Sequence, residues 1–281
     1  MKPLNKISSA VLLGIIFLFI TLTACNSGKK DQTATGENDT IPKEVVLSPE
    51  SQQMLKDFPT PFEVTELLEK AQAGYIFNIA NPPANVTNYN TEVSRALNLG
   101  VYSADLSYSV TYKSIDKTNE FMACTKKLAG DLGITSIYNQ EMLDKVKKFN
   151  NNKDSLVGMI TKTFAETNTF LADNNRNQVA VLITVGGFTE SIYLSAALAE
   201  FSKDNTKIFA LIASQKDNYT KLLSILEAFN ADETIKPIFD EVAKLKPIWE
   251  NYGIESGKKL SKENATAISK LAESVRAVLV K

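Results

Sequence analysis

The chain has 281 residues, of which 44% are hydrophobic and 22% charged, with 31 basic and 32 acidic side chains. This composition is typical of a globular protein with a sizeable core, and the near-zero net charge argues against a nucleic-acid-binding surface or a polybasic membrane patch. Histidine is absent from the sequence, which excludes Ser-His-Asp triads, Cys-His dyads and zincin helices.

Residues 1–24 have the pattern of a secretory signal peptide. Lys2 and Lys6 precede an apolar run from Val11 to Leu22, and small residues follow this run. A bilayer span needs about 20 apolar residues, so the run is too short to be a membrane helix. We therefore expect residues 1–24 to be removed by cleavage.

The sequence Leu22-Thr23-Ala24-Cys25 resembles the lipobox of bacterial lipoprotein precursors, in which an aliphatic residue and two small residues precede a cysteine. The resemblance implies cleavage before Cys25 and a diacylglycerol thioether on the Cys25 thiol. Anchoring by two or three acyl chains is physically sound, because a single chain binds membranes only marginally. The alternative is a plain signal peptide that leaves Cys25 free or paired.

The residues after Cys25 bear on where the protein is anchored. Asn26, and not Asp, follows the cysteine, which in lipoproteins generally indicates sorting to the outer membrane. The segment "NSGKKD" lacks the acidic cluster that directs some Bacteroidetes lipoproteins to the cell surface. We expect an outer-membrane, periplasm-facing protein, with the cell surface as the alternative. The polar composition of residues 25–47 predicts a flexible, lipidated tether.

Residues 48–281 are predicted to form a single all-α domain, a bundle of about eight to ten helices. Pro237 and Pro247 are expected to kink or shorten the helix that contains them. Beyond the first helices, the apolar periodicity and the turn residues predict helices near 89–112, 115–130, 138–150, 154–172, 176–202, 206–229, 233–252 and 261–280. The mature domain resembles uncharacterised helical lipoproteins of Bacteroidetes.

The first helices of the domain carry clear N-terminal signals. Ser48 precedes Pro49, which is the order of an N-cap and a proline in the first helical turn. Thr60, Pro61 and Glu63 fit a capping box with proline at the first helical position. We therefore expect helices to begin at Pro49 and Pro61.

Two segments, 96–112 and 179–201, are apolar on nearly every face. A helix that is hydrophobic all round lies at the centre of a bundle or spans a membrane. Glu190 lies within the second segment and favours a buried core helix. Gly186 and Gly187 are expected to permit close helix packing, although a ligand approaching the backbone is the alternative.

The candidate functional residues lie on these two central helices. Asp105 and Glu190 are acids in apolar surroundings, and Tyr102, Tyr108 and Tyr193 lie near them in sequence. Such a set fits a pocket for a cation or a hydroxyl-rich ligand, because buried carboxylates have shifted pKa values. Alternatively, each acid hydrogen-bonds a tyrosine or a helix end and orders the core. Paired carboxylates also occur in glycoside hydrolases.

Cys124 is the second cysteine and falls on an apolar helix face, so we expect a small hydrophobic role and no disulfide. No catalytic or metal-binding motif is recognised. The sequence thus favours a lipid-anchored envelope protein with a non-enzymatic helical domain that binds or organises a partner, without cofactor, metal or nucleic acid. A small-ligand receptor using the Tyr and carboxylate residues is the second hypothesis, and a hydrolase the third.

Overall fold

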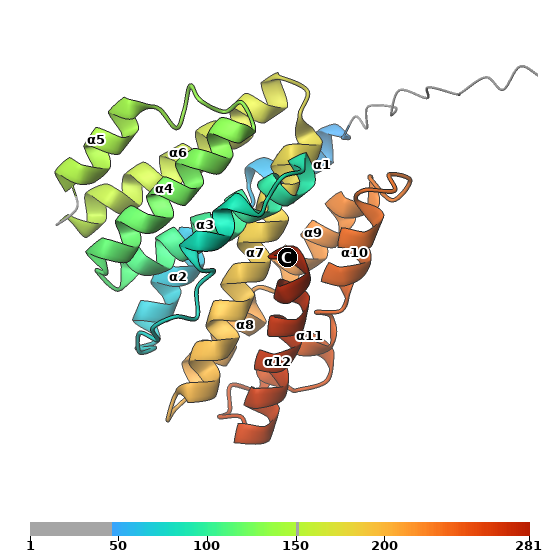
Figure 1. Cartoon of the computed structure of the whole chain (residues 1–281). Coiled ribbons are helices and arrows are strands. Elements are labelled where there is room, and N and C mark those ends of the chain that lie inside the picture. The colour runs from blue at the N-terminus through green and yellow to red at the C-terminus, as the bar shows by residue number, and fades with distance from the viewer. Residues whose placement is uncertain (1–46, 150–151) are drawn as a thin grey trace, which may run out of the picture. The chain divides into compact units, whose positions relative to one another are not determined.

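The structure is a computed structural model that describes residues 47–149 and 152–281. The chain divides into two compact units, residues 1–43 and 44–281, and all described residues lie in the second unit. The predicted signal peptide, Cys25 and the predicted tether up to residue 46 lie outside the described residues. Every regular element in the described part is helical, which confirms the predicted all-α, multi-helix bundle (Figure 1).

The helices follow one another along the chain with turns and loops between them. The first half contains α1 (Pro49–Lys56), α2 (Pro61–Lys70), the 3-10 helix η1 (Pro83–Thr87), α3 (Glu92–Thr111), α4 (Ile115–Asp131), α5 (Gln140–Phe149) and α6 (Lys153–Asp173). The second half contains α7 (Asn177–Phe201), α8 (Thr206–Ser214), α9 (Lys216–Glu227), α10 (Lys236–Ala243), α11 (Pro247–Glu250), η2 (Ile254–Ser256) and α12 (Lys262–Leu279).

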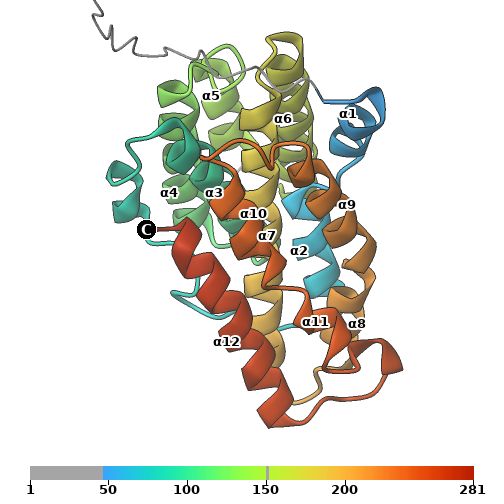
Figure 2. The same cartoon turned by 90° about the vertical axis from the view of Figure 1, so that its right-hand side faces the viewer.

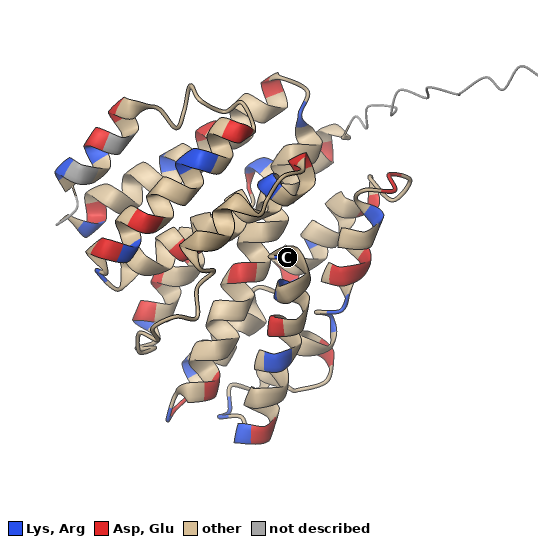
Figure 3. Ribbon diagram, viewed as in Figure 1, with Lys and Arg blue, Asp and Glu red and all other residues tan. Residues whose placement is uncertain are grey.

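Helices α3 and α7 form the centre of the bundle, as their composition predicts. Helix α7 runs through the middle of the domain, with α3 to α6 on one side and α9 to α12 on the other (Figure 1); Figure 2 shows it behind α10 and α12. Both central helices are buried along most of their length. Charged residues gather mainly on the surrounding helices, while α3 and α7 are largely uncharged (Figure 3).

Glycines on both central helices allow the backbones of α3 and α7 to touch. A Cβ atom built on Gly186 would lie 1.9 Å from the Leu97 carbonyl oxygen, and one on Gly100 would lie 2.0 Å from the Ile183 carbonyl oxygen. No side chain fits at such distances. A Cβ on Gly187 would likewise lie 2.9 Å from Pro61 Cγ, so the structure confirms that Gly186 and Gly187 serve close helix packing.

Helix α7 is also the helix among the described residues that is long and apolar enough to cross a membrane. Its most apolar 18-residue window is, however, completely buried inside the domain. The neighbouring helices therefore supply the apolar surroundings of α7, as expected for a core helix.

The predicted helix starts at Pro49 and Pro61 are confirmed, and the α2 capping box forms as expected. The Thr60 N–H donates to Glu63 Oε2 at 2.7 Å, and the Glu63 N–H donates to Thr60 Oγ1 at 3.4 Å. The prolines shorten the predicted 233–252 helix into α10 and α11.

The single helix predicted over 206–229 is interrupted at Gln215, between α8 and α9. Near this interruption the Trp249 indole N–H donates to the Ile212 carbonyl oxygen at 2.8 Å. The Ile212 carbonyl oxygen, which also accepts from the Gln215 N–H at 3.1 Å, thus gains a second donor from α11 at the end of α8. This contact depends on the tertiary fold and has no local sequence signal.

Helix α12 buries a different face from the one its apolar spacing suggests. Ile268 and Val275 are buried as expected, but Val278 is 39% exposed. The buried positions are Ala265, Ile268, Ser269, Ala272, Val275 and Leu279. This rotation directs the residue after Val275, Arg276, toward the centre of the domain.

Candidate functional site

Asp105 of α3 and Glu190 of α7 lie together at the centre of the domain. Both residues are fully buried, and the nearby Glu190 carboxyl contributes to a raised pKa of Asp105. Arg276 of α12 completes the group: its Nε donates to Glu190 Oε2 at 2.8 Å and its Nη2 donates to Glu190 Oε1 at 3.1 Å. We call these three residues the buried ionic cluster.

Arg276 carries the compensating positive charge of the buried ionic cluster. Its guanidinium carbon lies 4.7 Å from the centre of the Tyr193 ring, which adds a cation–π contact. Burial by itself lowers the pKa of Arg276, but the Glu190 carboxylate outweighs that effect and the pKa is raised. Arg276 therefore stays charged, and its two-point contact with Glu190 is of the strong, bidentate kind.

The surroundings of Asp105 favour its neutral form. Burial raises the pKa of its carboxyl well above the usual range, and repulsion by Glu190 raises it further, against the opposing effects of Arg276 and the Asn81 N–H. The Asn81 N–H donates to Asp105 Oδ2 at 3.1 Å, whereas Oδ1 has no hydrogen-bond partner in the described part of the chain. The raised pKa favours a protonated Asp105 beside Glu190, which leaves Arg276 one negative charge to balance.

A network of buried amide groups extends from the cluster to the end of α12. The Asn81 side chain donates to the Tyr89 hydroxyl at 2.8 Å, and that hydroxyl donates to the Val280 carbonyl oxygen at 3.3 Å. Asn98 of α3 donates to the Leu279 carbonyl oxygen at 2.9 Å. These bonds satisfy carbonyl groups at the C-terminal end of α12 and fix the helix against α3.

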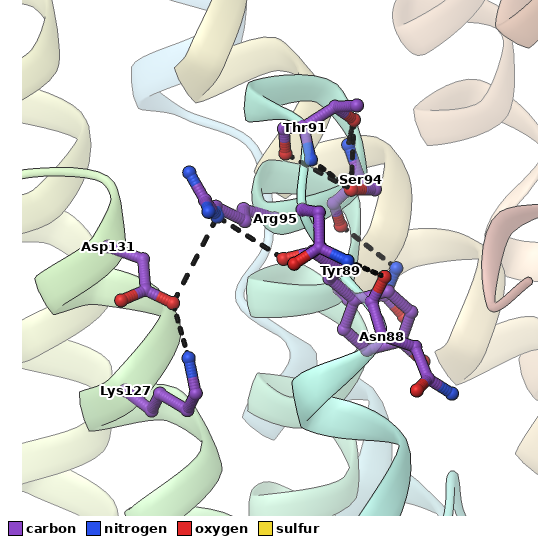
Figure 4. A network of polar contacts seen from close by, with 9 residues as sticks. Asn88, Tyr89, Thr91, Ser94, Arg95, Lys127 and Asp131 are labelled. Carbon is purple, nitrogen blue, oxygen red and sulfur yellow. Dashed lines mark hydrogen bonds and ion pairs between the residues drawn. The ribbon is translucent and has the colours of Figure 1, made fainter.

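A second network holds the start of α3 against the end of α4 (Figure 4). Arg95 Nε donates to the Tyr89 carbonyl oxygen at 3.2 Å and lies 4.0 Å from Asp131 Oδ2. Lys127 donates to the same Asp131 oxygen at 2.5 Å, and Thr91 caps α3. The segment before α3 is thus tied to both helices.

The five residues predicted to share a pocket do not line a common opening. Asp105, Glu190 and Tyr102 are fully buried, and Tyr193, packed on Arg276, is 9% exposed. The Tyr102 hydroxyl donates to the Pro82 carbonyl oxygen at 2.8 Å. The two acids therefore make their contacts inside the core of the domain. Of the five residues, Tyr108 lines an open cavity.

That cavity, which we call the aromatic hollow, has a volume of about 210 Å³ and lies where the segment 75–83 passes α3 and α4. Its wall consists mainly of aromatic and proline rings with a few polar groups. The lining residues are Tyr75, Ile76, Asn78, Ala80, Asn81, Pro82, Pro83, Tyr108, Lys117 and Phe121.

The aromatic hollow has a fixed inner wall and an exposed outer edge. The Tyr108 hydroxyl accepts from the Ile76 N–H at 2.8 Å and donates to the Ile76 carbonyl oxygen at 3.3 Å. The Tyr75 ring stacks on the Tyr108 ring with centres 5.1 Å apart. Phe77 packs edge-on against Tyr75 with ring centres 4.8 Å apart, yet Phe77 itself is 72% exposed.

A wider groove of about 720 Å³ lies between α5 and α6. Charged side chains line it, but they pair within their own helices: Lys145 lies 2.6 Å from Glu141, and Lys162 lies 3.5 Å from Glu166. Four of the five charged lining residues thus have local partners and Asp173 is the fifth, and surface pairs of this kind contribute little energy.

Cys124 of α4 is 4% exposed, and its Sγ lies 3.7 Å from the Pro83 carbonyl oxygen. Burial raises the pKa of its thiol to about 11. The thiol therefore stays protonated near neutral pH and packs as a small hydrophobic group. Within the described residues, no three or more acidic or cysteine side chains are grouped as a metal site would require.

The sequence prediction missed Arg276, the residue that explains the pairing of the two acids. A signal was present, because Arg276 follows Ala272 by four residues and Ile268 by eight and so lies beside the apolar stripe of its helix. Comparison with protein-family models, curated proteins and solved structures found no match.

Proposed function

We propose that this chain is a lipid-anchored protein of the cell envelope, whose helical domain binds a partner molecule and catalyses no reaction. The observation that carries this proposal is the lipobox-like sequence from Leu22 to Cys25, at the end of an apolar run that follows Lys2 and Lys6. The polar segment after Cys25 leads into the compact unit 44–281. The outer membrane, on its periplasmic side, is the proposed location.

The surroundings of the acids favour binding over hydrolysis. A glycosidase places its two carboxyl groups on either side of a bound sugar, with space between them for substrate or water. Here Glu190 uses both oxygens to bind Arg276, and Asp105 is fully buried beside it. The most strongly perturbed acid of the domain therefore has a role in the core, and the open cavity is the better candidate for contact with other molecules.

The anchor can be tested by changing Cys25 to alanine in cells grown with a clickable fatty-acid analogue. The wild-type chain should be labelled, the Cys25→Ala variant should lose the label and accumulate as precursor, and globomycin should have the same effect on the wild type. Cys124→Ala is the matched control and should keep the label, because Cys124 is buried in the domain. Continued labelling of Cys25→Ala would refute the anchor.

A further inference from the structure

We propose that the aromatic hollow binds one uncharged aromatic ring that carries a hydrogen-bonding group at its edge, a ligand of the phenol or indole class. The inference rests on the proposed binding role of the domain and names the chemistry of what is bound. It moves the ligand site from the acids, where the sequence placed it, to the segment 75–83 and its contacts with α3 and α4.

The size of the hollow selects a single ring system. Its volume is about 210 Å³, and an apolar protein cavity of roughly 150 Å³ is known to accommodate benzene. A substituted benzene ring or a fused bicyclic ring therefore fits, whereas a longer chain or an oligosaccharide would extend out of the hollow.

The walls favour an aromatic ligand over an aliphatic one of equal size. Tyr75, Tyr108 and Phe121 line the hollow, and Tyr75 is the half-buried one of the three, so its ring is the surface on which a ligand would stack. Aromatic rings attract one another in stacked or edge-on arrangements by roughly 0.5–1.5 kcal/mol beyond the area they bury. Phe77 is 72% exposed, lies in sequence between the lining residues Ile76 and Asn78, and packs edge-on against Tyr75, so it supports the Tyr75 ring from outside the hollow.

The charge of the lining favours a neutral ligand. Lys117 is the one charged residue in it, and its ammonium group already donates to Glu120 Oε2 at 2.7 Å. A charged ligand would lose its water without gaining a free partner charge, which is unfavourable. The exposed amide of Asn78 in the wall offers a hydrogen bond to a hydroxyl or ring N–H.

The domain holds the hollow open and in place. Tyr108 bonds both backbone groups of Ile76, the Asn81 N–H bonds Asp105, and the Pro82 carbonyl oxygen bonds Tyr102. Each contact joins the segment 75–83 to the buried part of α3. A site that is ordered before the ligand arrives loses less entropy on binding, so a small ligand can bind with useful affinity.

The test is equilibrium dialysis of the full chain as cells produce it, mixed with phosphatidylcholine vesicles whether or not Cys25 is acylated, with empty vesicles as the blank. Phenol and indole should each bind saturably at one site per chain. Cyclohexanol should bind about two- to tenfold more weakly, which is the worth of one aromatic contact, and benzoate should also bind more weakly because of its charge. Absence of saturable phenol and indole binding, or preference for benzoate, would overturn the proposal.

Two variants locate the binding site, and circular dichroism verifies that both are folded. Phe77→Ala should weaken indole binding by roughly two- to tenfold. Phe201→Ala is the matched control, since Phe201 is 71% exposed at the end of α7, and should leave binding unchanged. Equal effects of the two variants would place the ligand elsewhere and refute the inference. Fatty-acid labelling at Cys25 reports on the anchor separately, so either proposal can fail without the other.

Discussion

The buried ionic cluster and the aromatic hollow lie next to each other but differ in chemical composition and in exposure to solvent. The cluster gathers charged residues from α3, α7 and α12 and encloses nearly all of them, with the side chains of Glu190 and Arg276 0% and 13% exposed. The hollow gathers aromatic rings from a loop and two helices and is open to solvent, with Tyr75 and Lys117 half-buried and Asn78 exposed. Asn81 belongs to both regions, because it lines the hollow and its N–H binds Asp105.

The difference shows that a charged residue in a buried helix first requires a partner that neutralises its charge. Its presence alone is therefore weak evidence of a functional site. Three ionisable groups meet in the core, and one proton on Asp105 together with Arg276 makes the set neutral overall. The hollow, by contrast, has no charged group among its described lining residues that must be neutralised inside the core. We therefore expect changes in the cluster to alter folding and changes at the edge of the hollow to alter binding.

Replacement of Arg276 should have the largest effect on stability. Arg276→Met leaves Glu190 buried without its partner charge, and such a loss costs about 3–5 kcal/mol. The free energy of unfolding, measured by urea denaturation at pH 7, should fall by that amount. Lys216→Met is the control, because Lys216 pairs with Glu255 at 2.8 Å on the surface, and its unfolding midpoint should be unchanged. Similar losses in both variants would contradict the comparison.

Adding one methyl group between the central helices should be the next most damaging change. Gly186→Ala places a Cβ 1.9 Å from the Leu97 carbonyl oxygen, so α3 and α7 must move apart. Overpacking of this kind costs about 1–3 kcal/mol, which exceeds the higher helix propensity of alanine. Thermal denaturation should show a lower melting temperature.

The control for that prediction is Gly158→Ala in α6, where no atom lies within 4 Å of an added Cβ. Here only the helix propensity changes, and the variant should gain about 0.5–1 kcal/mol. If both alanine variants were stabilised, the close contact between α3 and α7 would be wrong.

The proton on Asp105 should make stability depend on pH. The folded-state pKa lies well above the usual value of 3.8, so the folded protein binds a proton that the unfolded chain releases. Its contribution is complete below pH 3.8 and is lost as pH rises through the folded-state pKa, at no more than about 1.4 kcal/mol per pH unit.

Asp105→Asn isolates this contribution, because an amide resembles the neutral acid and does not titrate. Urea denaturation between pH 5 and pH 8 should show a stability that falls less steeply for the variant than for the wild type. Parallel curves for the two proteins would mean that Asp105 does not hold the proton.

The sequence predicts the bundle well because its signals are local or periodic. The capping box at Thr60 and the apolar segments that become α3 and α7 each need only nearby residues to be recognised. The interruption at Gln215 escapes prediction because the contact beside it, from the Trp249 indole N–H, comes from a distant helix. Sequence patterns within one helix do not indicate contacts between helices that are far apart along the chain.

In the candidate site, too, some features could be predicted from local sequence and others could not. Asp105 and Glu190 are conspicuous in their apolar helices, so their burial could be anticipated. Their common partner, Arg276, is 86 residues away from Glu190 along the chain and looks like an ordinary basic residue in a last helical turn. The aromatic hollow depends on how Tyr75 meets Phe121, and no periodicity relates a loop residue to a residue on a separate helix.

The smallest expected change in stability comes from variants of the segment 75–83 and its contact with α3. Tyr108→Phe removes the hydroxyl that bonds the Ile76 N–H and carbonyl oxygen, and a hydrogen bond of this kind contributes about 0.5–1.5 kcal/mol. Phe77→Ala removes an exposed ring and should stay within about 0.5 kcal/mol of the wild type. Urea denaturation should therefore rank Tyr108→Phe as the less stable variant, while dialysis with indole should show a loss for Phe77→Ala. Because Tyr108 anchors the inner wall and Phe77 only extends the outer edge, a reversed stability order would mean that the segment 75–83 is held by contacts other than the tyrosine hydroxyl.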